Sequence, residues 1–392
     1  MDKIFFHIDV NSAFLSWTAV SKLNNGSDID LRTIPAIIGG DKEKRHGIVL
    51  AKSIAAGKYG IKTAEPIVSA FKKCPTLVME SPDFALYSEM SHKLMDYLHT
   101  LTDDIEQASI DECYMDFTPI AHFYESPIAA ADMIRKEVQN RFGFTVNIGI
   151  SDRKVLAKMA SDFTKPNRTH TCFSYEIREK MWPLPVGDLF LCGKSSREAL
   201  KKLEINTIGD LAEADLNILK SHLKSMGQTL WEFANGIDSS TVITEHAEAK
   251  GIGNSTTPPH DILTAGEASD VLLSLAESVS NRMHASKFKA LQVTLEIKYT
   301  TFKSYSHQTI LETPISTAKS IHSVALSLFD FLWNGDPIRL LGIRCAKLVS
   351  EDEPFQLSLF DMAQPDTKQL ALENAISDIR KRFGDSAIKR GM

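Results

Sequence analysis

The chain is poor in cysteine and has no long apolar run. Its five cysteines are odd in number, scattered, and never spaced like metal ligands. We therefore expect buried thiols in a reducing compartment rather than a disulfide framework. No apolar stretch is long enough to cross a bilayer and no secretory signal is evident, so the sequence predicts a cytoplasmic protein without membrane contact.

The chain also lacks a strong charge of either sign. It carries 44 Lys and Arg against 50 Asp and Glu, a formal net charge of −6. Nucleic-acid-binding proteins often carry a basic domain, so the sum counts somewhat against that class. Local charge matters more, and basic islands occur at 42–45, around Arg153 and at 194–202. Each island is equally typical of a solvated helix face.

A chain of 392 residues without repeats should form two or more domains. The first part mixes strands, a hairpin and helices, which predicts an α+β sheet with antiparallel pairs and helices packed on one face. From about 170 the pattern turns wholly helical, and a small α/β domain follows from about 250. The expected strands lie at 3–10, 35–39, 144–150, 291–299 and 340–349, with a hairpin at 104–118. The expected helices lie at 11–23, 53–59, 66–73, 84–100, 126–142, 152–164, 266–286, 317–333 and 367–383.

Two apolar strands end in acidic residues. The hairpin IEQASIDECYMDFT places Asp111 and Glu112 at its tip, and the first strand closes on Asp9. Charged groups beside so much apolar surface are costly unless a cation compensates them. Three carboxylates suit Mg²⁺ or Mn²⁺ and the chemistry of phosphoryl or nucleotidyl transfer. The alternative for one hairpin alone is an ordinary polar turn.

Two short patterns resemble signatures of other nucleotide-binding enzymes, but neither stands in the context that its signature requires. Gly193-Lys194-Ser195 resembles the end of a P-loop, but Asp188 stands where the earlier glycine belongs. The run GGDKE at 39–43 is similar to a signature of cyclic-dinucleotide synthases, but the acids of this chain lie on a different hairpin.

Two lysine-bearing segments remain. The segment 191–209 has the composition of a helix–hairpin–helix element, which binds DNA phosphates through backbone N–H groups, or of a helical subdomain with a glycine cap. The segment 146–167 runs from a strand into a lysine-rich helix. Lys165, fixed beside a proline, is suited to hold a triphosphate, whereas Lys158 at mid-helix is typical of a solvated position.

Together these segments resemble the Y family of DNA polymerases, the translesion class that includes DNA polymerase IV and the UmuC-type proteins. The similar motifs occur in the same order from residue 1 to about 350. The sequence at 47–52 is similar to that of Gram-positive members. Its motifs are HIDVNSAF at 7–14, SIDECYMD at 109–116, the run at 149–167, KGIG at 250–253 with Thr256-Thr257, and RLLGIR at 339–344.

The resemblance implies a right-hand polymerase. It would have a ferredoxin-like palm at 1–10 and 80–168, small fingers at 11–79, and a helical thumb with a helix–hairpin–helix at 169–243. An α/β little finger would follow at 244–350, and a clamp-binding motif with a helical tail at 351–392.

The resemblance also implies residue roles. Asp9, Asp111 and Glu112 would be catalytic and would bind two Mg²⁺ ions, with Mn²⁺ as a substitute and the Val10 carbonyl assisting. Phe14 would be a steric gate against ribonucleotides; without the family, a core aromatic is the better interpretation of Phe14. The other expected nucleotide contacts are Asn11, Ser12, Ala13, Ala51, Lys52 and Lys165. The expected DNA contacts are Gly193, Lys194, Lys298, Arg339 and Arg344.

Several positions depart from the family pattern. Asn11 replaces a second aspartate, and Ser12 and Ala13 replace residues that are usually aromatic. Ile54 and Gly57 stand where the family places the tyrosine and arginine that clamp the triphosphate. The sequence leaves open whether Lys52, Lys58 or His46 supplies the missing charge. Leu191 replaces the first glycine of the helix–hairpin–helix.

The segment QLSLF resembles the peptide with which bacterial replication proteins bind the sliding clamp. Its expected contacts are Gln356, Leu357, Leu359 and Phe360, and the alternative is a loosely packed linker. We therefore expect a monomeric, error-prone translesion DNA polymerase that acts on primer–template DNA and deoxynucleoside triphosphates. A catalytically weak or inactive DNA- and clamp-binding factor on the same fold is the main alternative, and a palm-fold nucleotide cyclase is a second.

Overall fold

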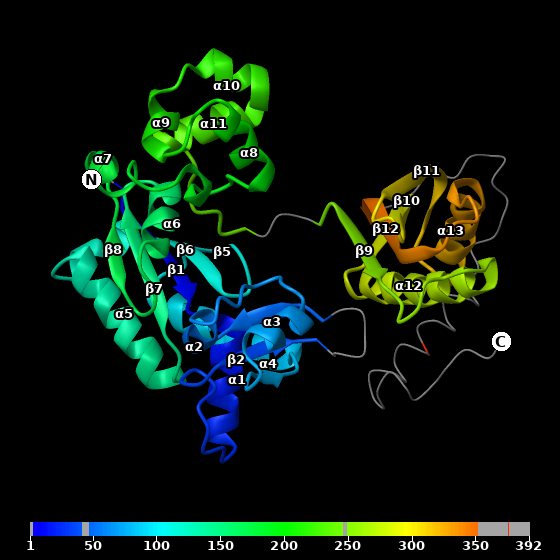
Figure 1. The fold of residues 1–392 in the computed structure, drawn as a ribbon, viewed down its shortest axis with the longest axis horizontal. Helices are drawn as coiled ribbons and strands as arrows, with labels where there is room; N and C mark the ends of the chain where they lie inside the picture. The colour runs from blue at the N-terminus through cyan, green and yellow to red at the C-terminus, as the bar shows by residue number, and fades with distance from the viewer. Residues whose placement is uncertain (1–2, 41–46, 246–248, 352–374, 376–392) are drawn as a thin grey trace. The chain divides into compact units, whose positions relative to one another are not determined.

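The protein is described here from a computed structural model, which covers residues 3–40, 47–245, 249–351 and 375. The chain forms two compact units, an N-terminal unit up to residue 245 and a C-terminal unit from residue 249. Each unit has its own sheets and helices (Figure 1). The predicted clamp contacts Gln356, Leu357, Leu359 and Phe360, and the predicted helical tail apart from residue 375, lie outside the described residues.

The N-terminal unit is built around a five-stranded sheet. Its spatial order is β5 (Ile105–Gln107), β6 (Glu112–Asp116), β1 (Phe5–Val10), β7 (Val146–Ser151) and β8 (Thr169–Thr171). β1 pairs antiparallel with both β6 and β7, and every one of its residues is buried. The acidic end of β1 therefore lies at the centre of the sheet rather than at an edge.

Helices cover both faces of this sheet, so the prediction of helices on one face was wrong. Phe6 and Ile8 of β1 belong to the core formed with α4 (Phe84–His99) and α5 (Pro127–Phe142). The alternate residues His7 and Asp9 point to the other face, which α6 (Lys154–Asp162) covers. α6 packs so closely that a Cβ added to Gly149 of β7 would lie 2.0 Å from a carbonyl oxygen of the helix.

A second, three-stranded sheet lies in the segment predicted as fingers. Its order is β3 (Val49–Lys52), β2 (Ala36–Gly39) and β4 (Val78–Glu80), with β2 and β4 parallel. α1 (Ala13–Asn24) joins the two sheets, since Trp17 packs in the larger core and Leu15 in the core of the small sheet. Two short helices complete this part, α2 (Ile54–Gly57) and α3 (Ile67–Lys73).

The segment beyond residue 170 is mainly helical, as predicted, but it opens with β8, which pairs parallel with β7. The strand was missed because Thr-His-Thr carries no apolar signal. The α-helices are α7 (Ile177–Lys180), α8 (Lys194–Lys202), α9 (Ile208–Glu213), α10 (Leu216–Leu223) and α11 (Ser225–Ala234). Short 3₁₀ helices lie at Thr118–Phe123, Ser174–Glu176 and Val186–Asp188.

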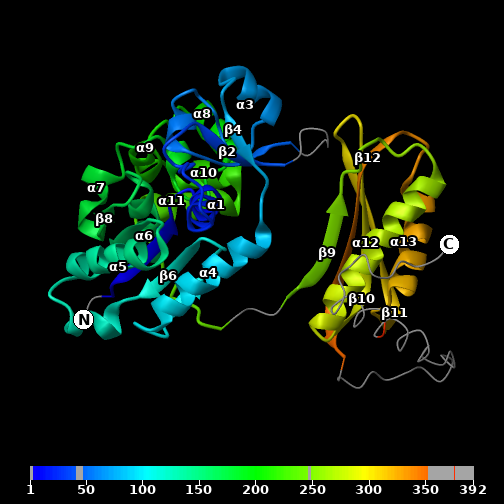
Figure 2. The same cartoon turned by 90° about the horizontal axis from the view of Figure 1, so that it is seen from below.

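The C-terminal unit is a four-stranded antiparallel sheet with two helices on one face (Figures 1 and 2). The strand order is β11 (Ser304–Ile315), β10 (Phe288–Tyr299), β12 (Ile338–Ser350) and β9 (Gly251–Thr256). Alternate residues of β10, such as Leu295 and Ile297, form the core with α12 (Ala265–Ala285) and α13 (Ala318–Leu332). No helix among the described residues is long and apolar enough to span a membrane.

Candidate active site and nucleic-acid interface

The backbone brings the three predicted acids together. Asp9 is the register partner of Glu112 in the β1–β6 pair. The next backbone N–H, that of Val10, donates to the Asp111 carbonyl oxygen at 3.0 Å. The turn before β6 therefore holds Asp111 beside the end of β1, so the backbone places the three predicted acids next to one another.

Two lysines from the α6 region neutralise these acids. The Lys165 ammonium lies 2.7 Å from Asp9 Oδ1, and the Lys158 ammonium lies 2.7 Å from Glu112 Oε1 and 3.6 Å from Asp9 Oδ2. Asp162, on the same helix, pairs with both lysines at 2.9 and 3.4 Å. The acids and lysines thus form one network on the face of the sheet that α6 covers.

The network shifts the pKa values of Asp9 and Glu112 in opposite directions. Burial, and then the adjacent Glu112, raises the pKa of Asp9 to about 7, although Lys165 and Lys158 oppose the shift. The pKa of Glu112 is lowered, chiefly by the nearby His7 imidazole and then by the neighbouring Asp9 and the Lys158 ammonium. The two neighbouring carboxylates repel each other when both are ionised. Added positive charge, such as a bound cation, is therefore favourable beside them.

His7 also belongs to this network, between Ser161 and Glu112. Its ring is fully buried, and burial lowers the pKa of the imidazole. Nδ1 lies 2.8 Å from the Ser161 hydroxyl, whereas Nε2 lies 3.7 Å from Glu112 Oε2 and has no hydrogen-bond partner. The unsatisfied Nε2 is therefore directed at the carboxylate of a predicted metal ligand.

The donor set fits a divalent cation, although the side chains do not converge on a single point. No group of three His, Cys, Asp or Glu side chains in the described part of the chain is arranged to chelate one ion. Asp111 instead accepts a hydrogen bond from the Ser109 hydroxyl at 2.7 Å, and Glu112 faces Lys158. The carboxylate oxygens are hard donors of the kind Mg²⁺ prefers, and their backbone positions are adjacent.

A cavity of about 410 Å³ opens beside the acids, within the range of small-molecule binding sites. Asp9, Val10, Asp111 and Lys165 line it from the sheet, whereas Glu112 is not among its lining residues. The remaining walls come from α1 and from the small sheet with its adjoining segments: Ser12, Ala13, Phe14, Leu50, Ala51, Lys52, Ser53, Ile54 and Thr63.

The cavity brings together most of the predicted nucleotide contacts. Ser12 has φ 48° and ψ 52°, a left-handed conformation that is strained for serine and that turns the chain sharply from β1 into α1. The Phe14 ring stacks on Tyr87, with centroids 4.3 Å apart and planes 6° from parallel, and packs edge-on against Phe84. Phe14 is therefore both a packed aromatic and part of the cavity wall.

Asn11 is the exception among the predicted nucleotide contacts. The side chain is buried and does not line the cavity. Its amide donates to Asn147 at 3.1 Å, and its oxygen accepts from the Thr145 hydroxyl and from the Asn167 backbone N–H. Because these bonds engage both the nitrogen and the oxygen of the amide, Asn11 holds the loop that carries Lys165 against the end of β1.

The predicted DNA contacts of the helical segment lie on the surface. Gly193 is the N-cap of α8 and Lys194 its first residue, with a side chain 83% exposed. Leu191, in the place of a family glycine, has φ 66°, so this turn keeps the left-handed backbone that glycine adopts without strain.

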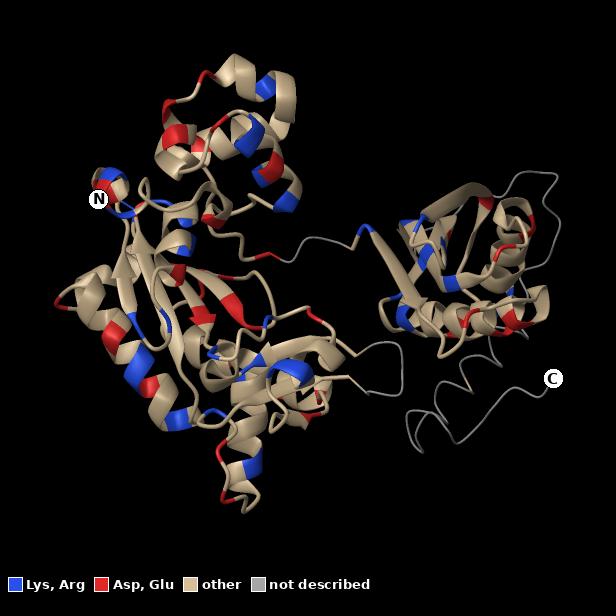
Figure 3. Cartoon of the chain, in the orientation of Figure 1, with Lys and Arg blue, Asp and Glu red and all other residues tan. Residues whose placement is uncertain are grey.

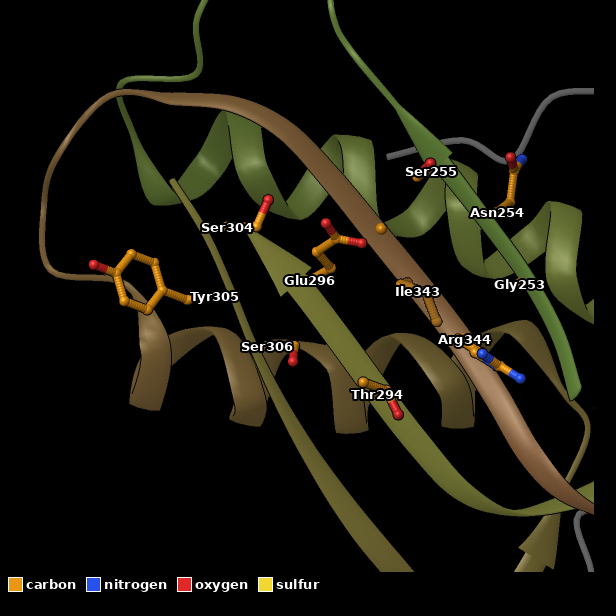
Figure 4. Close-up of a pocket in the computed structure, with 11 residues that line it drawn as sticks. Gly253, Asn254, Ser255, Thr294, Glu296, Ser304, Tyr305, Ser306, Ile343 and Arg344 are labelled. Atoms are coloured by element: carbon orange, nitrogen blue, oxygen red, sulfur yellow. The ribbon is translucent and has the colours of Figure 1, made fainter. Parts of the chain in front are cut away.

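The C-terminal unit presents an open sheet face with a shallow cavity of about 510 Å³ (Figure 4). Thr294, Glu296 and Arg344 project from neighbouring strands on the face opposite the helices. Lys298 follows at the same alternation, so Lys298 and Arg344 share this face. Arg339 lies apart from the cavity lining, with its guanidinium over the Phe302 ring.

Sequence reasoning missed Lys158, which was interpreted as a solvated lysine but is 9% exposed and paired with two of the acids. It also missed His7 and Asp162. The available signals were spacings: His7 lies two residues before Asp9 on the same strand face, and Asp162 lies one helical turn after Lys158.

Comparisons with known proteins agree with this geometry. Residues 8–162 match the model of the impB/mucB/samB family, and residues 249–359 match that family's C-terminal domain. The chain is 44% identical over 392 residues to "DNA polymerase IV" of Clostridium acetobutylicum, covering 100% of this chain and 98% of that protein. It is 35% identical to "DNA polymerase IV 1" of Bacillus subtilis, covering 99% of this chain and 92% of that protein.

A solved Y-family DNA polymerase chimera (Dbh–Dpo4–Dbh) has the same fold, with a TM-score of 0.76 and 22% identity over 88% of this chain and 99% of that one. The family models span more than half of the chain, and the relatives span almost all of it. The chain therefore belongs to the impB/mucB/samB family, the Y family of DNA polymerases.

Proposed function

We propose that this chain is a DNA-directed DNA polymerase that extends a primer on damaged templates by two-metal nucleotidyl transfer. The observation that carries the proposal is the register of Asp9 opposite Glu112, with Asp111 beside them and a nucleotide-sized cavity adjacent. Family membership supports the polymerase activity and the dependence on a divalent cation. We propose Mg²⁺ as that cation, bound as two ions, with Mn²⁺ as a substitute.

In this proposal Asp9, Asp111 and Glu112, with the Val10 carbonyl, hold the ions. When bound, such ions acidify the primer 3′-hydroxyl and neutralise charge on the triphosphate and the leaving pyrophosphate. The Lys165 ammonium pairs with Asp9. Once a cation compensates the acid, this ammonium would pair with the triphosphate instead. Lys158 would remain beside Glu112 and keep that carboxylate ionised.

We assign sugar selection to Phe14. Its ring stacks on the buried Tyr87 ring and also contacts Phe84, and the stacking on a buried residue limits how far it can move for a larger sugar. A rigid ring under the incoming sugar would exclude a 2′-hydroxyl by steric overlap. Ser12, Ala13 and Ala51 provide small side chains along the same cavity, which would leave room for distorted or damaged base pairs.

DNA contacts are proposed on both units. Gly193 and Lys194 at the exposed start of α8 would bind backbone phosphates without sequence preference. Lys298 and Arg344 on the open sheet face, and Arg339 at its end, would add further phosphate contacts. We also propose that the chain divides into palm, fingers, thumb and little-finger domains at the residues that the family resemblance implies.

We further propose that the protein acts as a monomer at the nucleoid and binds the sliding clamp through 356–360. The peptide QLSLF offers Leu357, Leu359 and Phe360 to apolar pockets. This proposal rests on sequence, because the segment lies outside the described residues.

The alternative is a catalytically weak or inactive DNA- and clamp-binding factor, and one observation favours it. Asp9 and Glu112 are both paired with lysines, and the three acids do not form a closed donor set among the described residues.

Primer extension decides between the two. We expect wild-type protein with Mg²⁺ to extend a primer on an undamaged and on an abasic template. Asp111→Asn combined with Glu112→Gln should lose the activity by about 10³-fold or more, because charge stabilisation in the transition state depends on the ions. Mg²⁺-independent activity, or no extension by the wild type on either template, would end the polymerase proposal. Formation of cyclic products from GTP or ATP alone would instead favour a cyclase.

A further inference from the structure

The two lysines of the nucleotide cavity differ in their partners. Lys165, on the palm side, is engaged by Asp9 and Asp162. Lys52, at the end of β3, is half-buried on the opposite wall, and its ammonium has no hydrogen bond or ion pair among the described residues. Burying part of an ammonium group costs free energy unless an anion compensates it. Lys52 therefore carries a positive charge that no side chain among the described residues compensates.

The backbone of Lys52 is fixed in place. Lys52 pairs with Ile37 in the β2–β3 ladder. The next residue, Ser53, is the cap of α2: its hydroxyl oxygen accepts the Ala56 N–H at 3.0 Å and donates to the Ile34 carbonyl at 2.7 Å. The lysine thus projects from a rigid junction between a strand and a helix, which is a suitable base for precise ligand binding.

Gly57 provides the space in which the Lys52 ammonium lies. A Cβ added to Gly57 would lie 2.9 Å from Lys52 Nζ and would meet no other atom within 4 Å beyond its chain neighbours and the backbone of its own helix. The ammonium therefore rests directly over the α-carbon of the glycine. A side chain at this position would occupy the space of the Lys52 ammonium, which would have to shift.

The other candidates for this charge are less suitable. Ile54 lines the cavity but is apolar and 58% exposed. Lys58, one residue beyond α2, is exposed and does not line the cavity. His46 lies outside the described residues. Among the described lining residues between 50 and 63, Lys52 is the one that carries a charge.

We propose that Lys52 binds the triphosphate of the incoming nucleotide from the fingers side, opposite Lys165, and that Gly57 is the position that admits it. This inference rests on the proposed polymerase function, and it assigns the phosphate contact that Ile54 and Gly57 cannot make. A lysine binds phosphate as a point charge, so its contribution should depend on the presence of phosphate rather than on the base.

Single-nucleotide incorporation by Lys52→Ala, with Lys58→Ala as the matched control, tests the assignment. We expect the KM for the deoxynucleotide to rise about tenfold or more in Lys52→Ala, because one charge-assisted phosphate contact is lost, while kcat changes by less than about threefold. Inhibition by pyrophosphate should weaken by a similar factor. Lys52→Arg should retain much of the affinity, and Lys58→Ala should match the wild type within about twofold.

Gly57→Ala gives an independent test. The added methyl should displace the ammonium and raise the KM in the wild-type background. In the Lys52→Ala background the same change should have no further effect, because the group it displaces is gone. Equal and additive effects in both backgrounds would show that Gly57 acts on the cavity without Lys52.

The outcomes separate this inference from the function it rests on. Wild-type extension with unchanged KM and pyrophosphate inhibition in Lys52→Ala would overturn the Lys52 assignment alone. Absence of extension by the wild type would overturn the function, and equilibrium binding of the Mg²⁺–deoxynucleotide complex, which needs no turnover, would then test Lys52. If Lys52→Ala fails to fold, unchanged KM in Gly57→Ala would overturn the assignment.

Discussion

The charge state of Asp9 depends on its neighbours more than on the carboxyl group itself. The side chain is 6% exposed, faces Glu112 across the β1–β6 pair and meets Lys165 at 2.7 Å. Its pKa of about 7 lies above the ordinary value of 3.8. Between these two pH values the folded protein keeps a proton that the unfolded chain releases, so stability falls as pH rises through this window.

Asp9→Asn should therefore stabilise the cation-free protein at pH 8. The neutral amide avoids the cost of ionising a buried carboxyl, and we expect a gain on the order of 2 kcal/mol in the free energy of unfolding, because loss of the Lys165 pair offsets part of the benefit. The gain should fall below about 1 kcal/mol at pH 4, where Asp9 is protonated in the folded protein and partly protonated in the unfolded chain, whose carboxyl pKa is near 3.8. Denaturant unfolding of both proteins in EDTA at pH 4, 6 and 8 measures the gain. A wild type that is more stable than Asp9→Asn at pH 8 would contradict the raised pKa of Asp9.

Phe14→Ala should admit ribonucleotides. Removal of the ring that stacks on Tyr87 opens the cavity wall beneath the expected sugar position. We expect discrimination against ribonucleotides, measured as the ratio of kcat/KM values, to fall about 100-fold or more, with a smaller loss for deoxynucleotides. Tyr87→Phe keeps the stacked pair and serves as the control. Unchanged discrimination would remove the gate role from Phe14.

At the residue scale, the sequence was sufficient to identify the three acids but not the buried side chains that surround them. Asp9, Asp111 and Glu112 were predictable because an acid at the end of an apolar strand is conspicuous. Lys158 was not, because a lysine in mid-helix is usually solvated and only the packing of α6 onto β1 buries it. Asn11 was assigned to the nucleotide from the family resemblance, whereas its side-chain amide donates to Asn147.

At the element scale, α6 is the part of the fold that organises the acids. It lies on the face of the central sheet that carries His7 and Asp9, and it supplies Lys158 and Asp162. Gly149 of β7 makes this packing possible, since an added Cβ would lie 2.0 Å from the Ala157 carbonyl oxygen and 2.4 Å from the Ser161 nitrogen. The helix backbone and the strand backbone are therefore in direct contact.

Gly149→Ala should destabilise the N-terminal unit strongly. The methyl would meet backbone atoms that cannot move without displacing α6, so we expect a loss of about 3 kcal/mol in the free energy of unfolding. Gly266→Ala, in α12, has only the Thr264 hydroxyl at 4.0 Å and should be neutral or slightly stabilising. Thermal or denaturant unfolding compares the two, and equal stability of both variants would contradict the close packing.

The elements that sequence patterns missed are those without an apolar period. β11, with the sequence SYSHQTILETPI, is exposed over much of its length because its outer edge has no neighbouring strand. β3 and β4 are short, and β4 is half-buried throughout. Long helices such as α12 and α13 were predicted to within two residues, since their apolar residues recur with helical spacing.

At the scale of the whole molecule, charge is mixed rather than concentrated. Acidic and basic residues are interspersed over both units (Figure 3), in line with a net charge of −6. Glu296 lies on the open sheet face beside Thr294 and Arg344 (Figure 4). A DNA-facing surface that includes an acid should bind phosphates weakly, so we expect the polymerase to depend on a second tether.

Deletion of 356–360 should abolish stimulation by the sliding clamp and leave basal extension within about twofold of the wild type. A tether raises the effective concentration of the enzyme at the primer end without changing its site. Primer extension with and without loaded clamp measures the effect, and replacement of Lys58 by Ala serves as an unrelated control. Equal stimulation of the deleted and full chains would refute the peptide assignment.

The most direct test of the account is the position of the divalent cation. Anomalous diffraction from crystals with primer–template DNA, an incoming nucleotide and Mn²⁺ locates the ions without reference to activity. We predict two peaks bridged by Asp9, Asp111 and Glu112, about 3.5–4 Å apart, with the Lys165 ammonium moved from Asp9 to the triphosphate. A bound nucleotide with no Mn²⁺ peak in contact with these three carboxylates would contradict it.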